Sequence, residues 1–255
     1  MSNFITLGVV LFVYMSFWFV VSLIRKRNDV ADTAWGLGFV TLTWVSFFIS
    51  NSFDLRVLIV NTLVTIWGVR LAWHIHQRNK GKGEDYRYLA WRNEWGKWFY
   101  LRSYFQVYIL QGIFLFLIVS PVLLINLSMG GIFGFFDYVG VFVWIIGFIF
   151  ESVGDAQLKN FISDPQNKGK LMRSGLWQYT RHPNYFGEVM QWWGLWLVSL
   201  SVPNGIYFIF GPLTITYLIL KVSGVPMLEK KMEENPDFAD YKRTTSVFIP
   251  WFKNK

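Results

Sequence analysis

Residues 4–24, FITLGVVLFVYMSFWFVVSLI, form an apolar stretch of 21 residues without a charged side chain. About 20 residues in a helix cross the hydrocarbon core of a bilayer. A signal peptide would carry its basic residues before the apolar stretch, whereas here Arg25, Lys26 and Arg27 follow it. We therefore expect residues 4–24 to be an uncleaved transmembrane helix.

Six further apolar stretches follow, and the composition is typical of a membrane protein. Hydrophobic residues make up 53% of the chain and charged residues 16%, against about 25% charged residues in soluble domains. The sequence thus predicts an all-α polytopic membrane protein of about seven transmembrane helices, in a single domain, 1–255, whose motif-rich half is 138–255. The six stretches are 34–50, 57–73, 105–126, 138–150, 189–201 and 206–220. The stretches 138–150 and 189–201 are short, so we expect their helices to extend into the polar flanks.

The basic residues are distributed asymmetrically along this topology. Segments 25–33, 75–104, 151–188 and 221–255 lie on one side of a seven-helix arrangement and hold 22 of the 24 Lys and Arg residues. Because cytoplasmic loops carry the excess of Lys and Arg, we expect the N-terminus outside and the C-terminus in the cytoplasm. This placement explains the net charge of +8 without a nucleic-acid partner.

The chain contains no cysteine and three histidines. The lack of cysteine excludes disulfides, iron–sulfur clusters and a thiol nucleophile. The histidines do not have a zinc-binding spacing, so the sequence predicts no metal site.

Polar residues concentrate on the side expected to be cytoplasmic. Asp32 precedes an apolar stretch and either caps its helix or places a carboxylate at the mouth of a cavity. Arg70, His74 and Arg78 are spaced i, i+4, i+8 and share one helix face. Arg70 either meets an anionic partner within the membrane or extends to the interface. The segment 81–88, GKGEDYRY, suits a loop over phosphates or sugar hydroxyls, and equally an interfacial loop.

A second group of polar residues follows the stretch 138–150. Glu151, Asp155 and Lys159 form another i, i+4, i+8 stripe, which is either an exposed ion-pair face or part of a site. A basic connection with Lys170 and Arg173 comes next.

The connection leads to TRHPNYFGEVMQWW, residues 180–193. Its proline suits the first position of a helix, which places Asn184 and Glu188 one turn apart on the same face. A helix N-terminus favours an anion such as phosphate, and Arg181 and His182 add donors just before it. A solvated helix cap explains Arg181 and His182 equally well, but it explains Glu188, which lies beside two tryptophans, poorly.

Five stretches together resemble the bacterial DUF1295 branch of the steroid 5α-reductase superfamily. Members of that superfamily are multi-helix membrane enzymes that use NADPH to reduce a carbon–carbon double bond conjugated to a carbonyl. The resemblance extends from Asp32 to Trp251, and its most specific element is the Asn-x-x-x-Glu of Asn184 and Glu188. The stretches are DTAWGLGF (32–39), GEDYRY (83–88), ESVGDAQL (151–158), GLWQYTRHPNYFGEVMQWWGLW (175–196) and YKRTTSVFIPWF (241–252).

The resemblance implies an oxidoreductase of a bacterial plasma membrane that binds NADPH on the cytoplasmic side. Its substrate would be a steroid-like or other lipophilic molecule that enters from the surrounding membrane lipids. Asn184 and Glu188 would contact the nicotinamide half of the cofactor, and Asp155 and Glu151 its adenosine or ribose groups. The other cofactor-binding residues implied are Arg70, His74, Arg78, Lys170, Arg173, Arg181, His182, Tyr185 and Lys221.

The chain departs from the steroid reductases at the residues that polarise the substrate ketone. Asp32 would replace a family glutamate on the second helix, while Trp67 or His74 stands where the family has a tyrosine. The catalytic candidates are therefore Asp32, His74 and a loop hydroxyl, that of Tyr86 or alternatively that of Tyr88.

Two other functions remain open. The RHPxYxG pattern at 181–187 and the later Glu233 and Glu234 are similar to isoprenylcysteine and phospholipid methyltransferases, which bind S-adenosylmethionine. The longer N-terminal half favours the reductase, because the small methyltransferases need fewer helices. A binding site in a transporter or assembly factor is the third alternative, but it would place polar groups near the middle of the membrane.

Overall fold

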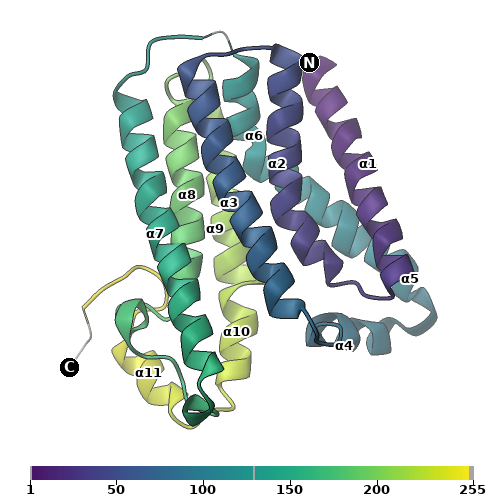
Figure 1. The fold of residues 1–255 in the computed structure, drawn as a ribbon, viewed down its shortest axis with the longest axis vertical. Coiled ribbons are helices and arrows are strands. Elements are labelled where there is room, and N and C mark those ends of the chain that lie inside the picture. The colour runs from purple at the N-terminus through teal and green to yellow at the C-terminus, as the bar shows by residue number, and fades with distance from the viewer. Residues whose placement is uncertain (1, 129, 253–255) are drawn as a thin grey trace. The chain divides into compact units, whose positions relative to one another are not determined.

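The computed structural model describes residues 2–128 and 130–252, and within these ranges the chain is helical, with one isolated β-bridge between Thr180 and Ser246 (Figure 1). The helices pack into two compact units. The first contains the residues up to Phe133 together with Ser201–Phe208, and the second contains Gly134–Leu200 together with the residues from Ile209 on.

Six helical segments are long and apolar enough to cross a membrane. They account for six of the seven expected spans, and the chain is an integral membrane protein. The seventh, 189–201, lies largely within α8 (Pro183–Ser199), whose 17 residues extend about 25 Å. As expected, 138–150 extends into its polar flank and becomes part of a 29-residue helix. The six segments are α1 (Ser2–Arg25), α2 (Val30–Ser50), α3 (Leu55–Asn79), Tyr86–Leu127, α7 (Phe135–Ser163) and Gly205–Met232.

In the first unit, α2 and α3 form an antiparallel pair that packs with α1 and α6 (Leu110–Leu127). Gly36 and Gly68 lie at the closest approach of α2 and α3, and a Cβ atom on Gly36 would stand 2.7 Å from the carbonyl oxygen of Gly68. The glycines that follow Asp32 therefore serve the contact with a neighbouring helix. Between α3 and α6 the chain forms α4 (Tyr86–Trp95), η1 (Gly96–Trp98), α5 (Phe99–Arg102) and the π-helix η2 (Ser103–Ile109).

In the second unit, α7 and α8 pack side by side (Figure 1). Gly140 and Gly147 of α7 meet Gly194 and Gly187 of α8, and a Cβ on Gly147 would stand 2.6 Å from the carbonyl oxygen of Gly187. Small residues allow this close backbone approach between membrane helices. The other elements are η3 (Pro165–Asn167), η4 (Gly175–Gln178), η5 (Gly205–Ile209, whose last residue alone belongs to this unit), α9 (Phe210–Tyr217), η6 (Leu218–Val222), α10 (Val225–Met232) and α11 (Phe238–Thr244).

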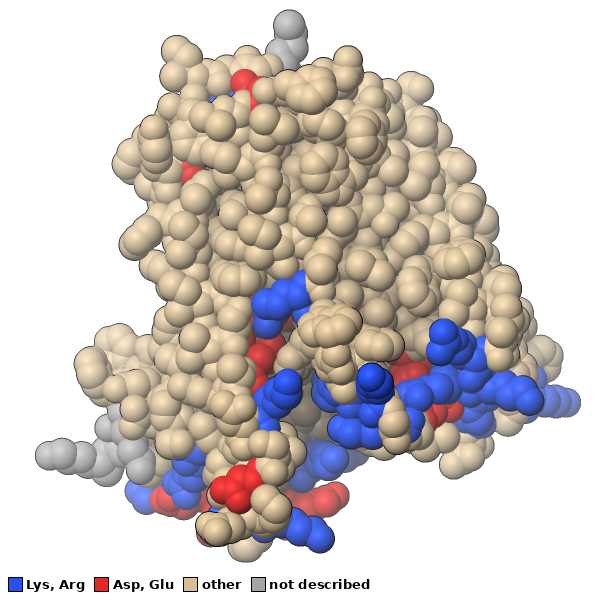
Figure 2. All heavy atoms as spheres, viewed as in Figure 1, with Lys and Arg blue, Asp and Glu red and all other residues tan. Residues whose placement is uncertain are grey.

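The surface of the first unit separates apolar from charged residues. Helix α1 exposes large apolar side chains such as Phe12, Phe17 and Ile24, as a lipid-facing helix does. Figure 2 shows blue and red spheres gathered where α3 leads into α4, and another group of them over the second unit near α11; most of the remaining visible surface is tan. The polar residues of interest thus lie at one end of this unit.

Candidate functional site

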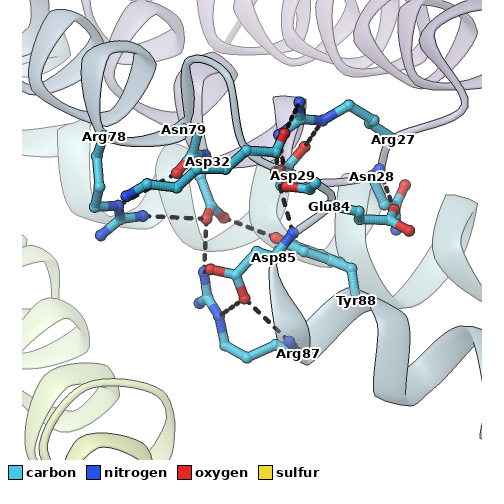
Figure 3. A network of polar contacts seen from close by, with 12 residues as sticks. Arg27, Asn28, Asp29, Asp32, Arg78, Asn79, Glu84, Asp85, Arg87 and Tyr88 are labelled. Atoms are coloured by element: carbon cyan, nitrogen blue, oxygen red, sulfur yellow. Dashed lines mark hydrogen bonds and ion pairs between the residues drawn. The ribbon is translucent and has the colours of Figure 1, made fainter.

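Asp32 lies in the first turn of α2, where the helix dipole favours a negative charge. Its carboxylate is also held by two side chains of α4, as Figure 3 shows. The Tyr88 hydroxyl donates to Oδ1 at 2.7 Å, and Nη2 of Arg87 donates to Oδ2 at 2.7 Å. The Asp32 side chain is 14% exposed. Asp32 therefore does more than start a helix, because it joins α2 to α4.

Arg87 connects Asp32 to a second carboxylate, that of Asp85 at the start of α4. Asp85 accepts from the Arg87 backbone at 3.0 Å and from its Nε at 2.9 Å. Burial raises the pKa of Asp85, but the hydrogen bonds from Arg87 outweigh burial, so the pKa lies below its ordinary value. Nη2 of Arg78 lies 4.0 Å from Oδ2 of Asp32. We call Asp32, Arg78, Asp85, Arg87 and Tyr88 the Asp32 cluster.

The loop between α3 and α4 is fixed to the turn between α1 and α2. Arg27 donates to the backbone oxygens of Lys82 and Gly83 and pairs with Asp29 at 2.7 Å, and this hydrogen-bonded pairing raises the pKa of Arg27. Glu84 accepts from the backbone of Asn28 at 2.6 Å. The acidic residues of the loop thus position it, and the Asp32 cluster rests on a fixed support.

The other predicted site residues of the first unit lie on α3 and α4. Tyr86 is the first residue of α4 and is 50% exposed; the hydroxyl that reaches Asp32 belongs to Tyr88. Arg70 and His74 are half-buried on α3, on the face that also carries Arg78. Trp67 is buried and packs edge-on against Phe39, with ring centroids 5.2 Å apart.

In the second unit, α7 and α8 bring together two carboxylates and two side-chain amides. Nδ2 of Asn184 donates to Oδ1 of Asp155 at 3.0 Å, and Nε2 of Gln191 donates to Oε2 of Glu151. Both carboxylates are buried. We call these the α7–α8 amide pairs. The structure thus joins Asn184 to Asp155, two residues singled out from the sequence, and adds Gln191, which was not. Gln191 could have been found because it follows Asn184 by seven residues, two turns along the same face.

Arg181 and His182 are buried and hold the C-terminal segment. Nε of Arg181 donates to Oε1 of Glu229 at 2.8 Å, and Nε2 of His182 lies 3.2 Å from the same oxygen. Nη1 of Arg181 also donates to the backbone oxygens of Thr245 and Lys242. We call this group the Arg181 clamp. It corrects the solvated-cap interpretation, because the donors are used inside the protein.

Glu229 was not singled out from the sequence. It lies in α10, a few residues before Glu233 and Glu234. Those two glutamates are exposed, and Glu233 lies 3.5 Å from Nζ of Lys242. Only the structure brings α10 to Arg181, so no spacing in the sequence indicated the pairing.

The remaining predicted residues of the second unit differ in exposure. Arg173 pairs with Asp240 and lies over the ring of Tyr241 at 5.2 Å, and its hydrogen bond lowers the pKa of Asp240. Lys170 and Lys221 are exposed, while Glu188 and Tyr185 are half-buried on α8. The Tyr185 ring stacks with that of His182, with centroids 5.7 Å apart. Among the residues that the structure describes, no three His, Asp or Glu side chains form a metal-binding group.

Comparison with known proteins identifies the family. Residues 18–245 match the family model described as "Protein of unknown function (DUF1295)", and the chain belongs to this family. An uncharacterized protein of Schizosaccharomyces pombe is 25% identical over 90% of this chain and 74% of its own length.

Two further relatives are named as enzymes. Mouse 3-oxo-5-alpha-steroid 4-dehydrogenase 1 is 30% identical over 44% of this chain and 41% of its own length. The very-long-chain enoyl-CoA reductase of Dictyostelium discoideum is 28% identical over 29% of this chain and 25% of its own length. The similarity thus spans less than half of each enzyme.

Proposed function

We propose that this protein is a membrane-embedded reductase of a carbon–carbon double bond conjugated to a carbonyl, with NADPH as donor and a lipophilic substrate. The observation that carries the proposal is the similarity to a steroid dehydrogenase and an enoyl-CoA reductase in a chain with six apolar membrane-crossing segments. The α7–α8 amide pairs support it, with their buried Glu151, Asp155 and Gln191 and half-buried Asn184, because neutral amides and carboxylates suit the hydroxyl and carboxamide groups of a dinucleotide.

The donor set fits NADPH in part. Oε1 of Gln191 is buried and has no hydrogen-bond partner among the described residues. It would accept from an amide or hydroxyl of a ligand only if α7 and α8 moved apart at the Gly147–Gly187 contact beside it. Asn184, Glu188 and Asp155 would contact the nicotinamide and ribose portions. The exposed Lys170 and Lys221 are the better phosphate ligands, because Arg173 and Arg181 are already paired with Asp240 and Glu229.

When bound, NADPH supplies a hydride to the β-carbon of the substrate. The protein must then stabilise the negative charge that develops on the carbonyl oxygen and provide a proton. We assign this part to the hydroxyl of Tyr88, which is buried and donates to Oδ1 of Asp32 at 2.7 Å. To act on a substrate, it would release Asp32 and donate its proton to the carbonyl oxygen instead. In this role Tyr88 replaces the exposed Tyr86, and His74 stays an additional candidate.

We further propose that the polar residues at the ends of α1, α3, α7 and α10 face the cytoplasm of a bacterial cell. Four segments with 22 of 24 Lys and Arg residues support this orientation. The same arrangement would place the N-terminus outside the cell and the C-terminus in the cytoplasm. It would also require a seventh span in the region of α8.

Ligand-induced thermal stabilisation of the purified full chain in detergent tests the cofactor. A ligand at 100 times its dissociation constant stabilises the folded state by about 2.7 kcal/mol. We expect NADPH to raise Tm and S-adenosylmethionine to leave it unchanged. The reverse result would make the protein a methyltransferase.

Two variants test where the cofactor binds. Asn184→Ala removes the amide that meets Asp155, and we expect it to abolish the shift caused by NADPH. Asn160→Ala, on the exposed end of α7, is the matched control and should keep the full shift. Full affinity in Asn184→Ala would remove the α7–α8 amide pairs from the site.

A further inference from the structure

Three helices of the first unit enclose polar side chains that the fold leaves without complete hydrogen bonding. Thr43 of α2, Asn61 of α3 and Asn126 of α6 are each 0% exposed. Four of their atoms have no hydrogen-bond partner among the described residues: Thr43 Oγ1, Asn61 Nδ2, Asn61 Oδ1 and Asn126 Oδ1. Buried polar atoms are nearly always bonded, and each exception requires an explanation.

The register of α2 and α3 places Thr43 and Asn61 at the same level. Gly36 and Gly68 mark the closest contact of the two antiparallel helices. Thr43 follows Gly36 by seven residues, and Asn61 precedes Gly68 by seven. Seven residues are about two helical turns, so both side chains lie on the facing surfaces, about two turns from the contact in the same direction.

A hydrogen bond further along the pair confirms this register. Nε1 of Trp44, which follows Thr43, donates to Oγ1 of Thr65 at 2.9 Å. The same Thr65 hydroxyl donates to the backbone oxygen of Asn61 at 2.6 Å. The segment around Thr43 therefore adjoins the turn that begins at Asn61.

The third side of this group is Asn126. Its Nδ2 donates to the backbone oxygen of Thr43 at 2.9 Å and to Oγ of Ser46 at 2.7 Å. The amide therefore faces α2 beside Thr43, while its Oδ1 stays unbonded. We call Thr43, Asn61 and Asn126 the Asn61 nest.

The unbonded atoms of the nest are complementary, yet they do not bond to one another. Asn61 Nδ2 is a donor, Asn61 Oδ1 and Asn126 Oδ1 are acceptors, and the Thr43 hydroxyl both donates and accepts. None of these atoms has a direct hydrogen-bond partner among the described residues, which leaves a gap in the hydrogen bonding of the nest. A water molecule both donates and accepts and bridges such a gap, and buried waters typically make about three hydrogen bonds.

We propose that the Asn61 nest holds ordered water between α2, α3 and α6. The groups in the nest are neutral, which favours water over an ion. The position within apolar helices strengthens the need for it, since hydrocarbon offers no alternative partner for an amide. The proposal does not depend on the enzymatic function.

Thermal unfolding of the full chain in detergent tests the proposal through two shape-conserving variants. If water satisfies the nest, Thr43→Val and Asn61→Leu each leave it with a missing partner, and each should lower Tm by about 3 °C. The double variant should lose less than the sum, because both changes disturb the same water. Thr62→Val, on the exposed side of α3, is the control and should keep the parent Tm.

If the Asn61 nest holds no water, the expected changes in Tm have the opposite sign. Removal of an unsatisfied polar atom is then favourable, so Thr43→Val would raise Tm and the two changes would add. That outcome overturns the proposal. The conservative Thr43→Val keeps the test decisive if Asn61→Leu fails to fold, and a high-resolution map of the parent protein should show density bridging Asn61 and Asn126.

Discussion

Each unit contains an arginine that meets a carboxylate, and the two arginines differ in what else they bind. The guanidinium of Arg87 donates to two carboxylates, those of Asp32 and Asp85. Asp32 also accepts a hydrogen bond from the Tyr88 hydroxyl. Arg181 bonds Glu229 and two backbone oxygens of the C-terminal segment.

This difference separates a structural role from a chemical one. An arginine that holds backbone oxygens fixes the path of the chain, so we expect the Arg181 clamp to have a structural role. A phenol that a carboxylate orients can act as a proton donor to a substrate. The Asp32 cluster, with Tyr88, is therefore the better candidate for catalysis. The variants below test this division.

The largest effect is expected at the Arg181 clamp. Glu229→Gln leaves the buried guanidinium without its counter-charge, and breaking such a pair costs about 3–5 kcal/mol. Thermal unfolding in detergent should show a large loss of Tm. The exposed Glu234→Gln is the control and should melt with the parent protein. Equal Tm values for the two variants would contradict the structural role of the clamp.

At the Asp32 cluster, activity should fall more than stability. Tyr88→Phe removes the hydroxyl that Asp32 orients, and general acid catalysis contributes about 10²–10⁴-fold. We expect kcat to fall at least about 10²-fold while the Tm shift with NADPH persists. Tyr86→Phe, two residues away at the exposed start of α4, should keep its activity. If Tyr86→Phe loses activity and Tyr88→Phe does not, the loop hydroxyl is that of Tyr86.

A packing change should have a smaller effect. A Cβ on Gly187 would meet the backbone of Glu151 and Gly147, so Gly187→Ala forces α7 and α8 apart at an expected cost of about 1–3 kcal/mol. Thermal unfolding measures this cost. Gly8→Ala is the control, because a Cβ on Gly8 has no neighbour within 4 Å, and its Tm should not fall.

The smallest effect concerns acid stability. Arg173 and Arg243 hold the pKa of Asp240 below its ordinary value, so the carboxylate stabilises the fold above the pKa of the unfolded chain, about 3.9. This stabilisation is lost as the pH falls through the lower folded value. Asp240→Asn should therefore reduce Tm slightly near neutral pH, and this deficit should shrink as the pH falls below the unfolded value, as unfolding at a series of pH values would show. An identical deficit at every pH would attribute the loss to packing.

The helices were largely predictable because apolar stretches of bilayer length leave few alternatives. The stretch 4–24 became α1 with almost the same limits, and 138–150 grew into α7 as its short length required. The interruptions were not predictable. The π-helix at Ser103–Ile109 packs against α1 and α6, and such contacts between elements leave no period in the sequence.

The candidate site shows the same limit. Asn184 and Asp155 were singled out by helical spacing and do meet. The choice between Tyr86 and Tyr88 depended on which side of α4 faces Asp32, and Glu229 depended on a contact between segments far apart in the chain. Spacing within one helix is visible in a sequence, whereas partners from other elements are not.

The glycine contact between α7 and α8 also limits the space between these two helices. Where Gly140 and Gly147 meet Gly194 and Gly187, the two backbones leave no room even for a methyl group. No molecule can therefore slip sideways between these helices along that length. Under the proposed function, a cofactor that reaches Asp155 and Asn184 from between the helices would arrive at the end where α8 begins, beside the chain segment that precedes α8.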